Sequence, residues 1–200
     1  MEIKISQGNS KMGKILSISL PSVITCREDV PCKKMCYARK LEGLRPAVRN
    51  AYETNWNLLN SNPRQYWAEL NAVLTLTRFF RFHVSGDIPN PEYLDNMVIA
   101  AGLNPHCNII CFTKRYEWVN DLIDNGGLIP ENLHIIFSVW RGLECNNKYN
   151  FPEAHVRIPK TQPTFRPDAK DCPGNCSECA MAFQNCWNLQ KGEQVVFNKH

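Results

Sequence analysis

The sequence lacks the features of a membrane-spanning or secreted protein. No apolar run approaches the length of a membrane span. The opening residues, MEIKISQGNSKMGK, have no apolar core of the kind that a signal peptide needs. Also missing are a Walker-type phosphate loop, a Gly-x-Gly-x-x-Gly turn and a Gly-x-Ser-x-Gly nucleophile elbow. These absences predict a cytoplasmic protein with no membrane partner, outside the common nucleotide-binding and serine-hydrolase classes.

A strong charge of one sign is also absent. The 200 residues include 23 Lys and Arg against 19 Asp and Glu, which gives a net charge of +4, and the basic residues are scattered. A dedicated nucleic-acid-binding domain carries a clustered positive charge. A solvated surface is therefore the favoured interpretation, and nucleic acid is a weakly supported candidate partner. The hydrophobic content of 44% is that of one ordinary globular protein.

Cysteine is what the sequence has in excess, because seven of its ten cysteines fall into two groups. The first bundle is Cys26, Cys32 and Cys36, and the second bundle is Cys172, Cys176, Cys179 and Cys186. Thiols in a reducing compartment seldom pair as disulfides, and no export signal is present to favour a secreted disulfide framework. Closely spaced thiolates instead predict a metal or iron–sulfur site.

The first bundle has the spacing Cys-x5-Cys-x3-Cys, followed directly by Tyr37 and Ala38. Three thiolates can hold three irons of a 4Fe–4S cluster and leave the fourth iron open for a substrate or cofactor. The alternative is a zinc site completed by His83 or by a cysteine of the second bundle, although structural zinc prefers Cys-x2–4-Cys pairs. Three further cysteines are interpreted as buried structural residues: Cys107, Cys111 and Cys145.

The second bundle places four cysteines within fifteen residues, in the spacing Cys-x3-Cys-x2-Cys-x6-Cys. Four thiolates can enclose one complete iron–sulfur cluster, which would transfer electrons or brace the fold. Tetrahedral zinc is a close alternative, because Cys176 and Cys179 have the spacing of half a zinc knuckle. Cys186 is the expected fourth ligand in both cases.

The periodicity predicts strands that alternate with helices. We expect strands over residues 15–20, 79–84, 108–113, 133–139 and 154–158, and a strand or extended tail over 193–198. Helices are expected after Pro46, Pro63 and Asn90, and over residues 116–124. This alternation favours a parallel sheet with right-handed crossovers. The chain is short for eight strands, so the predicted fold is α/β, a partial (β/α) barrel of about five to six mainly parallel strands.

Two domains are expected. Residues 1–160 would form the partial barrel with its N-terminal cysteine loop. Residues 161–200 would form a cysteine-rich metal-binding appendage and a terminal strand, because residues 161–192 lack periodicity.

Polar residues follow several of the predicted strands. The first bundle, Ser85-Gly86-Asp87, Thr113-Lys114, Trp140-Arg141 and Lys160 each come after a strand. In parallel α/β folds, ligands bind at the carboxyl ends of the strands. We therefore expect these residues to share one rim and to form a site.

Several motifs together resemble one family. They are Asn9-Ser10-Lys11, the first bundle with Tyr37-Ala38, Ser85-Gly86-Asp87, Phe112-Thr113-Lys114, Ser138-Val139-Trp140 and the cysteine-rich tail. With these motifs, which span nearly the whole chain, the sequence resembles the gene product 88 family. That group is largely encoded by phages and plasmids, and it is similar to radical S-adenosylmethionine (radical SAM) enzymes.

The resemblance implies a 4Fe–4S cluster on the first bundle, with S-adenosylmethionine bound to the open iron. It implies that Asp87 and Lys114 are catalytic and that flavodoxin or ferredoxin supplies an electron. The product of that reduction would be a deoxyadenosyl radical that abstracts hydrogen, in the host cytoplasm if a phage encodes the protein. The residues expected to bind the cofactor are Tyr37, Ser85, Gly86, Asp87, Lys114 and Ser138.

One departure leaves the roles of the bundles open. The usual radical SAM spacing, Cys-x3-Cys-x2-Cys, occurs at Cys172, Cys176 and Cys179 rather than in the first bundle. The first bundle is favoured as the radical site because only it follows the first strand of the sheet. Two other functions compete with a radical SAM enzyme: a non-catalytic iron–sulfur protein for electron transfer or redox sensing, and a zinc-stabilised module that binds nucleic acid or a partner.

Overall fold

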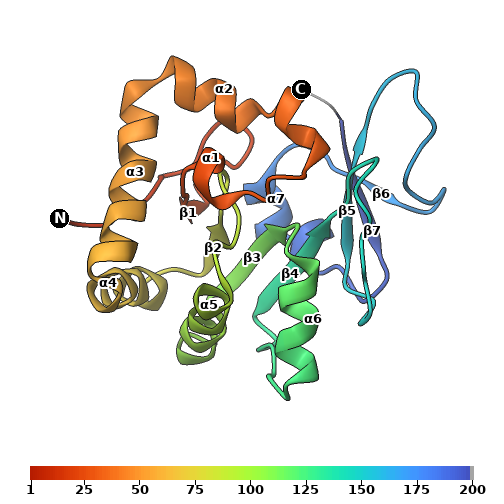
Figure 1. Ribbon diagram of the computed structural model, residues 1–200. Coiled ribbons are helices and arrows are strands. Elements are labelled where there is room, and N and C mark those ends of the chain that lie inside the picture. Colours follow the sequence, from red (N-terminus) through yellow and green to blue (C-terminus); the bar gives the residue numbers. More distant parts are fainter. Residues whose placement is uncertain (199–200) are drawn as a thin grey trace.

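The structure is a computed structural model, and it describes residues 1–198 (Figure 1). This part of the chain forms one sheet of seven parallel strands in the order β1-β2-β3-β4-β5-β7-β6. The strands are β1 (Leu16–Ile18), β2 (Phe79–Phe82), β3 (Asn108–Thr113), β4 (Leu133–Ser138), β5 (Glu153–Arg157), β6 (Lys170–Asp171) and β7 (Gln194–Asn198).

The sequence-based prediction of an α/β fold with a parallel sheet is confirmed. The sheet is not closed within residues 1–198, since β1 and β6 form its two edges. It also has seven strands rather than five or six. The additional strand is β6, which has only two residues and therefore too little sequence for any alternating pattern to appear.

Four longer helices cover one face of the sheet, which we call the helix face. They are α3 (Pro46–Ser61), α4 (Pro63–Thr75), α5 (Pro91–Leu103) and α6 (Tyr116–Asp124). Proline opens α3, α4 and α5, where its missing N–H leaves no helical bond unmade. Asn62 and Asn90 cap α4 and α5 by accepting bonds from Gln65 N and Tyr93 N at 3.1 and 2.8 Å. These helices pack on Phe80, Phe82, Ile109, Cys111, Ile135 and Phe137, all buried.

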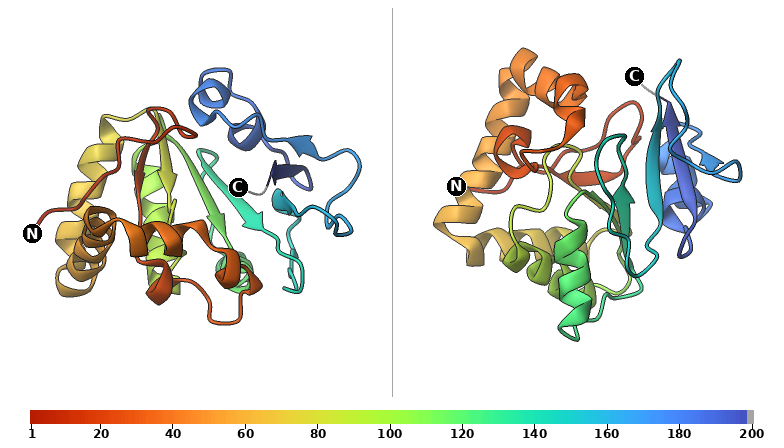
Figure 2. Two further views of the ribbon diagram at one scale, coloured as in Figure 1. Left: turned by 90° about the horizontal axis from the view of Figure 1, so that it is seen from above. Right: turned by 45° about the vertical axis from the view of Figure 1, so that its right-hand side comes forward.

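Three short elements follow the carboxyl end of β1: α1 (Ser22–Thr25), η1 (Pro31–Met35) and α2 (Tyr37–Leu44), with η denoting a 3₁₀-helix. The opposite face of the sheet, which we call the site face, carries α7 (Cys176–Met181) and η2 (Asn185–Trp187). Ile110 points to this face and packs with Met12, Ile15, Cys179, Ala180 and Trp187. In Figures 1 and 2 the blue C-terminal segment accordingly lies on the other side of the strands from α6.

The cysteine-rich C-terminal segment is joined closely to the sheet and to the N-terminal loop. The ring of Trp187, 1% exposed, meets the ring of Phe79 edge-on with centroids 5.1 Å apart. Cys176 N donates to Lys11 O at 2.9 Å, and Ser177 Oγ donates to Met12 O at 2.9 Å. The expected appendage thus shares a hydrophobic cluster with β3, and the domain boundary at residue 160 stays a prediction.

Among residues 1–198, no helix combines the length and the apolar character needed to cross a membrane.

Candidate functional site

Asp87 ties together the carboxyl ends of the central strands. Its carboxylate is 5% exposed. It accepts bonds from Thr113 Oγ1 at 2.6 Å, Ile88 N at 2.8 Å and Lys114 N at 2.9 Å. Its own N–H donates to Thr25 Oγ1 at 3.1 Å. The carboxylate is therefore engaged within the protein, which makes Asp87 a tie between β2, β3 and the first bundle. Its expected catalytic role stays a prediction.

The turn before Asp87 is pressed against the chain that leads into the first bundle. Gly86 has φ +83°, and a Cβ there would lie 2.5 Å from Thr25 Oγ1 and 2.7 Å from Leu20 O. Only glycine fits this conformation and this approach. Ser85 Oγ donates at 2.6 Å to Glu42, a buried carboxylate of α2 that also accepts from Ser22 N at 3.2 Å. No sequence signal indicated Glu42, because it lies outside every motif.

The three thiols of the first bundle gather at this rim. Cys26 follows α1, Cys32 lies in η1 and Cys36 precedes α2, and all three are partly exposed. Burial raises the pKa of Cys26 to about 12; the charges of Asp87, Cys36 and Cys32 raise this pKa further, and Lys114 opposes them. Burial likewise raises the pKa of Cys32, again opposed by Lys114. Lys114 is thus the cation that acts on this bundle.

Lys114 also links two strands, because its Nζ donates to Ser138 Oγ at 2.8 Å across the ends of β3 and β4. Two arginines pin the cysteine loop to the same rim. Arg27 Nη1 donates to Lys114 O at 3.1 Å, and Arg115 Nη2 donates to Thr25 O at 2.8 Å. The structure therefore brings Asp87, Lys114 and the first bundle together, as the positions after the strands indicated, and it adds Ser138, which only the family resemblance had named.

Tyr37 lies between the two bundles. Its side chain is 54% exposed, but its hydroxyl points inward and donates to Val84 O at 2.6 Å. Burial of that hydroxyl raises its pKa; Arg81 opposes the shift, and the charges of Cys36, Cys26 and Cys176 add to it. The charge of Cys176, in the second bundle, therefore acts on a tyrosine that directly follows Cys36 of the first bundle. The long separation of these residues in sequence did not indicate this.

The four thiols of the second bundle lie around α7 and η2. Cys179 is buried, and Cys172, Cys176 and Cys186 are partly exposed. Burial raises the pKa of Cys186 to about 12, and the charges of the other three thiols raise it further while Arg81 opposes them. Lys114 thus acts on the first bundle, whereas Arg81 acts on Cys176 and Cys186 of the second bundle and Lys11 acts on Cys176 as well.

Neither bundle is preformed around a metal. In the part of the chain that the structure describes, no three His, Cys, Asp or Glu side chains are arranged so that they could hold a metal ion. His83, the alternative zinc ligand, is buried with its Nε2 3.2 Å from Tyr93 Oη, and burial lowers its pKa to about 3. Metal binding would require the thiols to approach one another and to lose protons.

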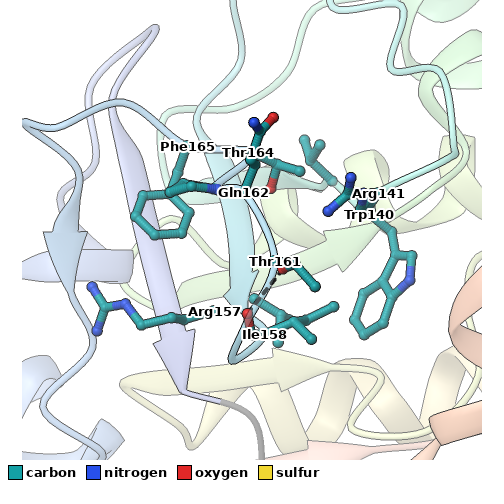
Figure 3. Close-up of a pocket in the computed structure, with 11 residues that line it drawn as sticks. Trp140, Arg141, Arg157, Ile158, Thr161, Gln162, Thr164 and Phe165 are labelled. Carbon is teal, nitrogen blue, oxygen red and sulfur yellow. Dashed lines mark hydrogen bonds between the residues drawn. The ribbon is translucent and has the colours of Figure 1, made fainter.

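A pocket opens beyond Ser138, at the carboxyl ends of β4 and β5 (Figure 3). Its volume is about 130 Å³. Trp140 and Phe165 stand on opposite sides of it, and Thr161 Oγ1 donates to Ile158 O at 2.9 Å. The predicted rim residues Trp140 and Arg141 line this pocket, whereas Lys160 does not. The pocket adds Phe165, a residue of the irregular segment that carried no sequence signal.

Comparisons with known proteins point to phage proteins. A family model described as Gene product 88 matches residues 3–169. The Gene 88 protein of Mycobacterium phage L5 is 33% identical over 127 residues, which are 54% of this chain and 51% of that protein. The Gene 88 protein of Mycobacterium phage D29 is 33% identical over 107 residues, 44% of this chain and 42% of that protein. The matches thus span about half the length of these relatives or less. No solved structure gives a significant match.

Proposed function

The chain belongs to the gene product 88 family, and for this member we propose an iron–sulfur enzyme of the radical SAM type. The first bundle would hold the reactive cluster, and the second bundle a further cluster or zinc. One observation carries the proposal: three thiols and one cation gather at the carboxyl ends of parallel strands, where α/β enzymes bind their ligands.

The side chains of the first bundle are of the type that binds an iron–sulfur cluster. The first bundle offers three soft thiolate ligands and no fourth cysteine of its own, which leaves one iron open to a further ligand. Lys114 favours the thiolate form that binding requires. When bound, a reduced cluster with S-adenosylmethionine supplies the one-electron chemistry that yields a deoxyadenosyl radical.

The residues around the first bundle would bind and orient the organic ligands. Lys114 and Ser138, already bonded to each other, present an ammonium and a hydroxyl suited to a carboxylate. Tyr37 offers an exposed ring face beside Cys36. Asp87 and Ser85 would hold the rim rigid, because both are engaged in buried hydrogen bonds. The pocket between Trp140 and Phe165, which opens beyond Ser138, would be a site for a substrate.

The first test is the metal content of protein purified without oxygen. Iron and sulfide in equal amounts, with the absorption of a 4Fe–4S cluster, are expected. The reduced protein is then incubated with S-adenosylmethionine, and 5′-deoxyadenosine is measured. A cluster-loaded protein that forms no cleavage product would instead indicate electron transfer or redox sensing. A colourless protein that contains zinc and no iron would overturn the iron–sulfur proposal.

Two substitutions test the assignment of the two sites. Cys32→Ala is expected to remove the cluster of the first bundle alone, and Cys179→Ala the metal of the second bundle alone, because each lies in a separate group of thiols. Cys145→Ala is the control: this cysteine lies outside both bundles and is partly exposed rather than buried as predicted, whereas Cys107 and Cys111 are buried. If either bundle variant stayed folded but lost both metals, the two-site assignment would be wrong.

A further inference from the structure

Arg81 is a charged residue of the site face with an unmet hydrogen-bond donor. It lies in β2, in register with Ser17 of β1 and Ile110 of β3. Its Nε is buried, and no residue among 1–198 accepts a hydrogen bond from it. The guanidinium carbon lies over the ring of Phe112, 4.8 Å from the centroid, and this contact does not provide an oxygen or sulfur acceptor for the Nε–H.

The surroundings of Arg81 are the second bundle. Phe112, on which the guanidinium rests, packs with Cys176 and Cys186 in one hydrophobic cluster. Phe112 also packs with Cys172 and Cys186 in a second cluster. Ile110, the register neighbour of Arg81, packs with Cys179. Every cysteine of the second bundle therefore belongs to a cluster formed with Phe112 or Ile110, the residues next to Arg81.

No carboxylate balances this charge. None of the ion pairs within residues 1–198 includes Arg81. A buried guanidinium donor without an acceptor is unfavourable, because it has lost water and gained nothing in exchange. A tetrahedral centre of four thiolates and one divalent ion would carry two negative charges, and its sulfur atoms accept N–H bonds.

We propose that Arg81 is the counter-charge of a four-thiolate centre in the second bundle, with its Nε–H directed at the bound thiolates. This inference rests on the proposed function in one respect, since it requires the second bundle to bind a metal. Arg81 would be a positioning residue rather than a metal ligand. It would fix the orientation of the cysteine side chains and stabilise their thiolate form.

The test is binding of Co²⁺ to the full chain without oxygen, followed by thiolate-to-cobalt absorption. Cys32→Ala and Cys179→Ala assign the absorption to the two bundles. Arg81→Gln is expected to weaken Co²⁺ binding at the second bundle by about 10–100-fold, the usual effect of removing a partner of metal ligands. The affinity of the first bundle is expected to stay unchanged. Arg78→Gln is the matched control, because Arg78 is an exposed arginine nearby that rests on the ring of Phe79.

Two further variants separate charge from packing. Arg81→Lys keeps the positive charge and loses Nε, so it is expected to recover part of the affinity. Arg81→Met keeps the aliphatic length and loses the charge, so it is expected to resemble Arg81→Gln. The free energy of unfolding of each metal-free variant is measured as well. If Arg81→Gln or Arg81→Met does not fold, the other of these two variants is compared with the wild type.

The outcomes distinguish the two proposals. Wild-type affinity at the second bundle in a folded Arg81→Gln or Arg81→Met protein would overturn the role of Arg81 and leave the proposed function intact. Equal weakening by Arg78→Gln would also overturn it, since a general loss of surface charge would then be the cause. Failure of the wild-type second bundle to bind Co²⁺ at all would remove both the second metal site and the role of Arg81.

Discussion

The two cysteine bundles use the same atoms in different surroundings. The first bundle lies in a loop at the carboxyl ends of the strands, and all three of its cysteines are partly exposed. Hydrogen bonds from Arg27 and Arg115 hold this loop to the rim. The second bundle packs in hydrophobic clusters with Trp187, Ile110 of β3 and Ile136 of β4. Cys172, Cys176 and Cys186 of the second bundle are also partly exposed, and Cys179 is buried. The difference in surroundings predicts a site suited to a substrate at the strand ends and a site suited to support beside the sheet.

The cations of the two bundles differ in the same way. Lys114 at the first bundle is held by Ser138, through a flexible stem that can change partners. Arg81 at the second bundle is fixed on the ring of Phe112. An ammonium on a flexible stem suits a site that binds and releases ligands, whereas a planar guanidinium packed on a ring suits a permanent centre. The four changes that follow test whether this contrast holds.

The largest effect is expected from Trp187→Ala. The indole is 1% exposed and fills the space between α7, β2 and the N-terminal loop, so its removal should lower the free energy of unfolding by about 3–5 kcal/mol. Denaturant unfolding measures the loss. The thiols of the second bundle should also react faster with a thiol reagent while those of the first bundle do not. Phe183→Ala, at a side chain that is 44% exposed, is the control and should cost much less.

Asp87→Ala is expected to act at the first bundle. It leaves Thr113 Oγ1 and the N–H groups of Ile88 and Lys114 without their acceptor, which should lower the free energy of unfolding by about 2–4 kcal/mol. Chemical denaturation and iron content are the measurements. Iron should be lost from the first bundle only. Asp95→Ala, on the exposed side of α5, is the control. Loss of metal from the second bundle instead would contradict the separation of the two regions.

Acid is expected to lower the free energy of unfolding through His83, a buried residue that directly follows β2. The pKa of His83 in the folded protein is about 3, because the ring is buried, whereas its ordinary value is 6.5. Above pH 6.5 the ring is neutral in both states. As the pH falls from 6.5 towards 3, only the unfolded chain gains this proton, so stability is lost. At pH 5 the loss is about 2 kcal/mol.

Unfolding free energies at pH 7 and pH 5 measure this effect. His83→Asn should remove most of the difference, since Asn tolerates the φ of +57° found at this position. A difference that persists unchanged in His83→Asn would assign the acid sensitivity to another group.

The smallest effect is expected from Tyr37→Phe. The change removes one hydrogen bond, to Val84 O, and keeps the ring, so the cost should be about 0.5–1 kcal/mol. Both bundles should still bind metal with wild-type stoichiometry. If Tyr37→Phe altered the metal content of both bundles together, the two would be one coupled site rather than two regions with separate roles.

Much of the sheet could be predicted from the sequence. The strands over 79–84, 108–113 and 133–139 are apolar runs that end in polar residues, and the structure has β2, β3 and β4 there. Proline and asparagine marked the starts of α3, α4 and α5 in the same way. These features are local, because a strand pattern or a helix cap lies within a few neighbouring residues.

The arrangement of the C-terminal segment could not be predicted, because its contacts are not local. Trp187 packs on Met12, Ile15 and Ile110, which are far away along the chain, and the segment itself has no periodicity. The hydrogen bonds of Asp87 were missed for a similar reason, since a carboxylate after a strand can serve chemistry or hold a loop. The sequence predicted which polar residues follow the strands. It did not predict the hydrogen-bond partner of each of these residues.

The contact between Gly13 and Ser177 has a consequence for the order of assembly. Gly13 has φ +63°, and a Cβ there would lie 2.1 Å from Ser177 Oγ, while Ser177 accepts a bond from Lys14 N at 3.0 Å. The hydrogen bond between Lys14 and Ser177 joins residues 163 positions apart in sequence, so it forms late during synthesis and is costly in loop entropy. The thiols of the first bundle emerge from the ribosome long before the second bundle exists. If both bundles bind metal as proposed, the first bundle would be available to metal during translation, and the second only after the C-terminal segment has packed on the N-terminal loop.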